Sequence, residues 1–354
     1  MRSLLVCCLL LINVTLISGC ALPYYWQAAA GQLKLLGQRV PISEVIADPK
    51  QSETIRAALR HAVEVREFAV SEIGLPDNDS YRSYADLGRP YVVWNVIAAG
   101  EFSIDARQWC FPIAGCVIYR GYFDEAAAQR YAESLSVEGL DTYVSGVSAY
   151  STLGYLSDPI LNTMLTGGEL YIAGVIFHEL AHQRFYISGD TELNEAFASA
   201  VEEYGVQQWL SVAGDAQALE GYRNRQRRRK DFFRLVTDQQ VRLRDIYATP
   251  MTPDEMRDAK SAAFATLVTE YENVRRSWGD STDYEGWFSQ PLNNAQIASV
   301  TAYSKWLPSL RFYLSQHGLE AFYAEMAQLT ELPESERALR VASYSATIPL
   351  PEQR

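Results

Sequence analysis

The sequence has only 4 histidines and 5 cysteines, and it contains no internal repeat or low-complexity segment. Its 31 Lys and Arg stand against 43 Asp and Glu, which gives a formal net charge of −12. Because nucleic-acid binding relies on a basic surface, this balance argues against a nucleic-acid partner. The one basic run, residues 223–230, lies in a helical pattern and is interpreted as a solvated helix face. Contact with an anionic lipid or glycan is the alternative.

A membrane-spanning segment is also missing at the N-terminus, where the apolar run Leu4–Ile17 has only the length of a signal-peptide core. Two small residues follow it directly before Cys20, which resembles the lipobox of bacterial lipoproteins. Residues 1–19 are therefore predicted to be a lipoprotein signal peptide, with Cys20 as a diacylated anchor in the membrane. An ordinary secretory signal peptide with an incidental cysteine is the alternative. Ala21 follows the cysteine instead of Asp, which indicates the periplasmic face of the bacterial outer membrane as the location.

The few cysteines fit an exported protein. Cys7 and Cys8 leave with the signal peptide and Cys20 carries the lipid, so Cys110 and Cys116 remain. An even pair around a tight Pro/Gly loop in an oxidising compartment predicts a disulfide. A second metal site is the weaker interpretation, because no histidine lies nearby in the sequence.

Two of the histidines form an H-E-x-x-H motif, His178 to His182, in an apolar stretch that predicts a mostly buried helix. Residues four apart share one helix face, so both imidazoles can point at one ion. Zinc in a catalytic site needs a third protein ligand and an open position for water, and Glu195 at the start of the next predicted helix is the candidate ligand. Glu179 is placed to act as general base on the water that the metal activates. A solvated His/Glu helix without metal is the alternative.

At this point the residues resemble a known family. HELAHQ followed by LNEAFASAVE is similar to the gluzincin metallopeptidases, above all the aminopeptidase N-like enzymes. Twelve residues separate His182 from Glu195, fewer than in aminopeptidase N. From about Cys20 to about Thr330 the chain more specifically resembles a family of predicted zinc aminopeptidases from Gram-negative bacteria, which are predicted lipoproteins.

Two further residues are expected to complete the site. Glu202 lies seven residues after Glu195, two helical turns on, and is predicted to orient a ligating histidine from behind. A plain surface position is the alternative for Glu202. Gluzincins commonly supply a Tyr or His from their later helical part to stabilise the oxyanion, and Tyr303 is the candidate here.

A strand predicted over Tyr143–Tyr150 precedes the metal helix, and the resemblance implies that it binds the substrate backbone along its edge. Gly146 would let a substrate approach closely, next to Val147. Aminopeptidase N-like enzymes also carry a glutamate in this region that binds the free α-amine, but residues 145–149 contain none. Exopeptidase specificity is therefore left open.

The fold is predicted to be α+β and predominantly helical, a gluzincin-like catalytic domain with a small upstream sheet and a helical C-terminal half. Residues 20–45 form the lipidated anchor and lead-in helix, and residues 46–354 form the metallopeptidase domain, with an α+β lobe to about residue 212. The other expected elements are helices over Tyr24–Leu36, Ser52–Glu72, Asp124–Leu135, Gln217–Tyr247 and Thr252–Trp278, strands over Tyr91–Ala98 and Cys116–Phe123, a helix from Pro291 through Tyr303 that breaks at Pro308, and a helix end at His317-Gly318.

These observations predict a zinc-dependent peptide hydrolase of the aminopeptidase kind, with one Zn²⁺, a peptide substrate and Glu179 as general base. A non-catalytic zinc-binding outer-membrane lipoprotein and an endopeptidase are the alternatives. The presence of Glu179 favours an enzyme, because a structural zinc site needs no general base.

Overall fold

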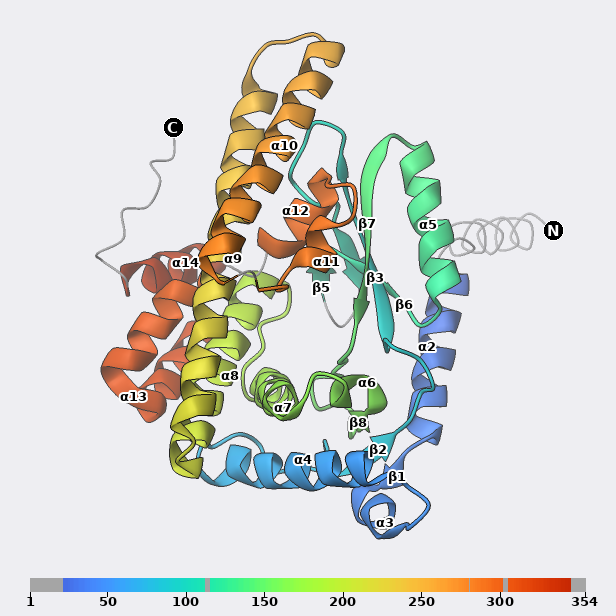
Figure 1. The fold of residues 1–354 in the computed structure, drawn as a ribbon, viewed down its shortest axis with the longest axis vertical. Helices are drawn as coiled ribbons and strands as arrows, with labels where there is room; N and C mark the ends of the chain where they lie inside the picture. Colours follow the sequence, from blue (N-terminus) through green and yellow to red (C-terminus); the bar gives the residue numbers. More distant parts are fainter. Residues whose placement is uncertain (1–21, 112–114, 280, 302–304, 345–354) are drawn as a thin grey trace, which may run out of the picture.

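The computed structural model describes residues 22–111, 115–279, 281–301 and 305–344, and Figure 1 shows that most of this part of the chain is helical. The predicted α+β, predominantly helical fold is confirmed. No helix in these ranges is both long enough and apolar enough to span a bilayer. In chain order the elements are α2 (Leu22–Gly37), β1 (Val40–Pro41), α3 (Ile42–Ala47), α4 (Glu53–Ser71), β2 (Ser83–Ala85), β3 (Val93–Gly100), β4 (Trp109–Phe111), β5 (Gly115–Val117), β6 (Arg120–Tyr122), α5 (Glu125–Val137), β7 (Leu140–Val147), β8 (Ile160–Leu161), α6 (Asn162–Leu165), α7 (Glu169–Arg184), α8 (Thr191–Ala213), α9 (Ala216–Ala248), α10 (Pro253–Ser277), α11 (Glu285–Phe288), α12 (Asn294–Thr301), α13 (Leu307–Thr330) and α14 (Glu334–Ser343).

The main sheet has the strand order β6-β3-β7 and is antiparallel throughout. Successive side chains of a strand point to opposite faces. Trp94 and Val96 of β3 accordingly pack against α5, while Ile97 and Ala99 pack against Ala295 of α12. Both faces of the sheet are therefore covered by helices, and β7 forms one of its two edges.

Helices α7 and α8 lie against one another and form the centre of the largest hydrophobic core. Two glycines allow their close approach. A Cβ on Gly205 would lie 2.7 Å from Cδ2 of the Phe177 ring, and a Cβ on Gly174 would lie 3.2 Å from Oε1 of Glu202. Gly205 therefore makes room for a core ring, and Gly174 makes room for a carboxylate between the two helices.

The helical second half begins with the hairpin of α9 and α10. Thr252 and Glu255 form a capping box at the start of α10, in which each side chain accepts from the other's backbone N–H, and Pro253 opens the helix. The two helices join through apolar side chains that include Phe232, Leu267 and Tyr271.

Two predicted elements differ from the structure. The single strand expected over Cys116–Phe123 is wrong, because residues 118–119 leave the strand conformation and separate β5, which pairs with β4, from β6, which pairs with β3. The helix expected to break at Pro308 is also wrong. Pro308 lies in the first turn of α13, where its missing N–H leaves no helical hydrogen bond unmade.

The predicted helix end at His317-Gly318 is confirmed, because Gly318 interrupts α13 with a φ of 78°. His317 donates from Nδ1 to the carbonyl oxygen of Tyr313 at 3.0 Å, which satisfies one of the last carbonyls before the break.

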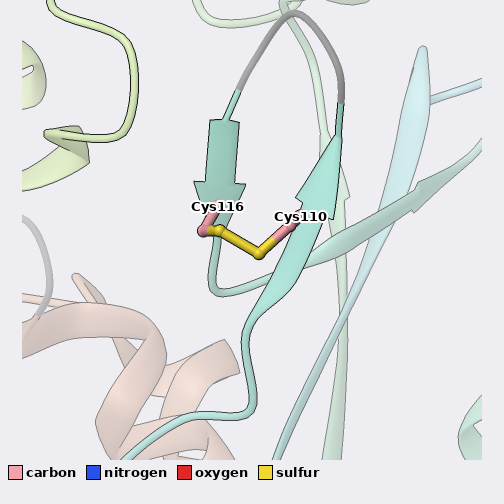
Figure 2. The surroundings of a disulfide bond; sticks show 2 residues. All are labelled: Cys110 and Cys116. Atoms are coloured by element: carbon pink, nitrogen blue, oxygen red, sulfur yellow. A yellow bond between two sulfur atoms is a disulfide. The ribbon is translucent and has the colours of Figure 1, made fainter.

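The hairpin of β4 and β5 carries the two remaining cysteines at directly opposite positions, and a disulfide joins Cys110 to Cys116 (Figure 2). This hairpin abuts the turn between α7 and α8. A Cβ on Gly115 would lie 2.8 Å from the backbone nitrogen of Gly189 in that turn.

Candidate metal centre

Three predicted ligands converge from two helices. His178 and His182 lie on α7 and Glu195 lies on α8, and their possible ligand atoms all lie within 4.8 Å of one another. The two Nε2 atoms are 3.2 Å apart. Glu195 places Oε2 at 3.3 Å from Nε2 of His178 and Oε1 at 3.6 Å from Nε2 of His182. Both ring nitrogens and the carboxylate therefore face one point.

The turn between the helices sets the position of Glu195. Asn194 is buried and closes this turn with two hydrogen bonds to Ile187, accepting from its N–H at 2.8 Å and donating to its carbonyl oxygen at 2.7 Å. Asp190 caps α8 by accepting from the N–H of Leu193 at 3.3 Å, and Arg337 of α14 holds the same carboxylate at 2.9 Å. The short turn is thus fixed at both ends, and Glu195 faces the histidines.

The donor set fits a divalent cation such as zinc. Two imidazole nitrogens and one carboxylate are a ligand combination of catalytic zinc sites, and three protein ligands leave a fourth position open. Two ring nitrogens at 3.2 Å repel each other when both present lone pairs, and a cation between them removes that repulsion. Burial raises the pKa of Glu195, but its interactions with the nearby His182 and His178 outweigh burial and hold the pKa below its usual value. The carboxylate is therefore anionic at neutral pH, as a ligand must be.

Glu202 lies directly behind His178. Its Oε2 is 3.1 Å from Nδ1 of His178, the ring nitrogen opposite the one that faces the cluster. Arg229 of α9 lies between two carboxylates of α8, with Nη1 3.9 Å from Glu202 and 3.7 Å from Glu203, and Arg311 of α13 pairs with Glu203 in turn. The side chain of Glu202 is 22% exposed and takes part in this row of alternating charges.

Glu179 lies beside the cluster, on the turn of α7 between the two histidines. Burial raises the pKa of its carboxyl to about 7, against the lowering effect of His178, and Glu195 adds to the rise. A carboxyl with a pKa near neutrality can both take up and release a proton at working pH.

Two cavities meet at the cluster, because His178 and Glu179 line both of them. Val147 of β7 also lines both. The cavity of about 670 Å³ contains all three predicted ligands and is further lined by Tyr119, Tyr150 and Tyr186. The cavity of about 920 Å³ is further lined by Glu169, Tyr171, Glu202, Tyr222, Arg225, Arg229 and Asp283.

The edge strand lies next to these cavities, but it spans Leu140–Val147 and so begins and ends three residues before the predicted strand. The space above Gly146 is filled by Tyr91, because a Cβ there would lie 2.3 Å from Cδ2 of that ring. Gly146 is thus explained by packing within the chain rather than by room for a substrate. Val147 lines both cavities, and its role in binding the substrate backbone stays a prediction.

Two further predicted site residues, Tyr303 and Cys20, lie outside the residues that the structure describes. His61 of α4, which lies outside the cluster, donates from Nε2 to the carbonyl oxygen of Glu169 at 2.9 Å.

The basic run is only partly a solvated face. Four of its six basic residues are exposed, namely Arg223, Arg225, Arg227 and Lys230. Arg228 instead contacts Asp283 at 2.5 Å, and Arg229 contacts Glu202 and Glu203 as described above. These pairs could not be predicted from the sequence, because their acidic partners are far away along the chain. Tyr119 was also missed, since it enters the cavity from the short break between β5 and β6.

A scan against family models gave a match over residues 23–341, a span that contains the metal cluster, Glu179 and Glu202. No curated protein and no solved structure matched the chain. The match covers most of the sequence, from the second residue of α2 into α14. The chain therefore belongs to the family described as "Putative aminopeptidase".

Proposed function

We propose that this protein is a zinc-dependent peptidase that hydrolyses peptides with Glu179 as general base. The observation that carries the proposal is the convergence of His178, His182 and Glu195 on one point beside a buried carboxyl, at the junction of two cavities. The family supports peptide hydrolysis as the reaction class. A purely structural metal site needs neither the cavities nor Glu179.

His178, His182 and Glu195 would hold the zinc ion. When bound, zinc supplies a Lewis acid that polarises the scissile carbonyl and lowers the pKa of a water molecule towards neutrality. Glu202 accepts the Nδ1–H of His178, which fixes the tautomer and the ring orientation and leaves Nε2 free as a ligand atom.

Glu179 moves the proton. Its carboxylate takes a proton from the attacking water and passes it to the nitrogen of the leaving amine. The pKa of about 7, raised mainly by burial, suits both halves of this transfer near neutral pH.

Tyr119 is the described residue that we assign to the developing oxyanion. Tyr119 lines the smaller cavity, which is also lined by all three predicted ligands. Burial raises the pKa of Tyr119 far above its usual value, and the charge of Glu195 adds to this, so the phenol stays protonated and can donate a hydrogen bond. Val147, at the edge of the sheet, is placed to align the substrate backbone as an added strand.

The description of the family as aminopeptidases favours the removal of single N-terminal residues as the specificity. An endopeptidase is the second candidate, because Glu179 lines two cavities, which together offer room for a chain on both sides of a cleaved bond. Besides Glu179, the described carboxylates that line the two cavities are Glu169, Glu195, Glu202 and Asp283. Glu195 and Glu202 contact His178, and Asp283 contacts Arg228. Glu169 has no such contact with the cluster, because it lies ten residues before Glu179 on the same helix, about 15 Å away at 1.5 Å per residue.

The test compares the parent protein with Glu179→Gln on amino-acid p-nitroanilides that carry either a free or an acetylated amine. We expect the parent to cleave the free-amine substrates, and Glu179→Gln to lose about 10²–10⁴-fold in rate while keeping its zinc. Cleavage of longer acetylated peptides at internal bonds would identify an endopeptidase. A zinc-loaded protein that cleaves no peptide would identify a non-catalytic zinc protein.

We also propose that Cys20 carries the acyl chains and tethers the enzyme to the periplasmic face of the outer membrane. The support is the short apolar run followed by small residues before this cysteine.

A further inference from the structure

Helix α2 is fixed to the protein by one face. Gln27 donates from Nε2 to the carbonyl oxygen of Gly121 at 3.3 Å and accepts from the N–H of Phe123 at 3.1 Å. Phe123 lies on Gly31, where a Cβ would be 2.2 Å from its ring, and Leu35 is buried in the main core. These positions repeat every four residues and mark the inner face.

The opposite face of α2 is apolar and exposed. Leu22 is 63% exposed, Tyr25 46%, Trp26 75% and Leu33 70%. At 100° per residue these four positions lie within about 100° of one another, centred roughly opposite the inner face. We call them the α2 outer face.

A helix with apolar residues on both sides is normally buried on both sides. α2 contains no acidic residue and has Lys34 as its one charged residue. Figure 1 shows it at the periphery of the molecule, and the exposures above show that no described part of the chain covers its outer face. Exposed apolar strips of this kind mark contact with another protein or with a membrane.

The position of α2 in the chain decides between these partners. Cys20, the proposed acylated residue, precedes Leu22 by two positions, so its Cα lies at most about 7 Å from the first residue of α2. An acyl-bearing N-terminus therefore places the start of this helix at the surface of the bilayer. Trp and Tyr are the residues enriched at that depth, because their rings are amphipathic.

We propose that the α2 outer face lies in the headgroup region of the outer membrane and is a second attachment point beside the acyl chains. This inference rests on the proposed location and goes beyond the proposed peptidase activity. An interfacial helix of this kind adds affinity through its buried apolar area. It also holds the enzyme in one orientation, which acyl chains alone do not do.

The test uses the chain from residue 20 onward with Cys20→Ser, so that no acyl group contributes. Binding is measured by flotation with vesicles of phosphatidylethanolamine and phosphatidylglycerol. We expect measurable binding, and a partition coefficient about tenfold lower for each of Trp26→Ser and Leu33→Ser. Leu339→Ser on α14, where the side chain is 74% exposed, is the matched control and should bind as the parent does.

A local probe identifies the contacting face. With Cys110 and Cys116 in their disulfide, Ala29→Cys adds one free thiol to the α2 outer face for an environment-sensitive fluorophore. We expect vesicles to shift its emission to the blue, and to leave the same fluorophore at Ala262→Cys on α10 unchanged.

Three results would overturn the proposal: no vesicle binding by the Cys20→Ser chain, equal emission shifts at both labelled positions, or a dimer that Trp26→Ser converts to monomers. The last result would mean that a second copy of the chain covers this face. Acylation of Cys20 is measured separately by lipid labelling of the parent, so a failure of the anchor and a failure of the outer face are distinguishable.

Discussion

Replacing Glu202 by Ala tests how the candidate metal centre is held. The variant removes the carboxylate oxygen 3.1 Å from Nδ1 of His178 and nothing else that faces the cluster. His178 then loses the group that fixes its tautomer and ring orientation, and Arg229 loses one of its two carboxylate neighbours. The other two predicted ligands, His182 and Glu195, are untouched.

The expected effect is a zinc affinity about 10–100-fold lower, the range seen when partners of a ligating histidine are removed. This corresponds to about 1.4–2.8 kcal/mol. Glu202→Gln keeps an oxygen that can accept the Nδ1–H of His178, so its loss should be much smaller. The contrast separates orientation of the ring from the mere presence of a side chain at this position.

Competition with a chromophoric chelator measures the affinity of each variant for zinc. Glu192→Ala is the control, because Glu192 lies on the same helix but contacts Lys305, 2.9 Å away and outside the cluster. It should bind zinc as the parent does. If Glu202→Ala bound zinc with the affinity of the parent, the orienting role of Glu202 would be refuted. Glu202 would then be explained only by its ion pair with Arg229.

Four further predictions concern other parts of the molecule. Glu179→Gln should bind zinc with parental stoichiometry and lose most turnover, and joint loss of metal and activity would contradict its role as base. Tyr119→Phe should lower kcat and leave zinc affinity unchanged; a fully active variant would move the oxyanion role elsewhere, with Tyr303 as the next candidate. Gly205→Ala should lower the free energy of unfolding by about 1–3 kcal/mol in urea titrations, because its Cβ would overlap a core ring, whereas Gly221→Ala has open space and should not destabilise. Cys20→Ala should abolish acyl labelling and release the protein from the membrane fraction, and unchanged retention of an unlabelled parent would contradict the anchor.

The parts of the site that the sequence predicted depend on spacing within one helix. His178 and His182 share a face because they are four residues apart, and Glu195 and Glu202 share a face because they are seven apart. The capping box at Thr252 is likewise a local pattern, with its partner three residues away. Such relations hold wherever the helix packs, so they can be read without knowing the fold.

The parts that were missed depend on contacts between distant segments. Arg229 meets Glu202 across two helices, and Tyr119 reaches the cavity from a two-residue break between strands that pair with different partners. The sheet of β1, β2 and β8 contains strands of two or three residues, too short for an alternating pattern to be recognised. Gly146 suggested room for a substrate beside the strand, but the ring of Tyr91 occupies the space above this glycine.

Zinc titration of the chelator-treated protein, with peptide hydrolysis followed at each addition, tests the central claim most directly. We predict no hydrolysis without metal and a rate that rises in proportion to bound zinc and levels off at one ion per chain, held by His178, His182 and Glu195. Hydrolysis that persists in the metal-free protein, or a protein that takes up no zinc at all, would contradict the account.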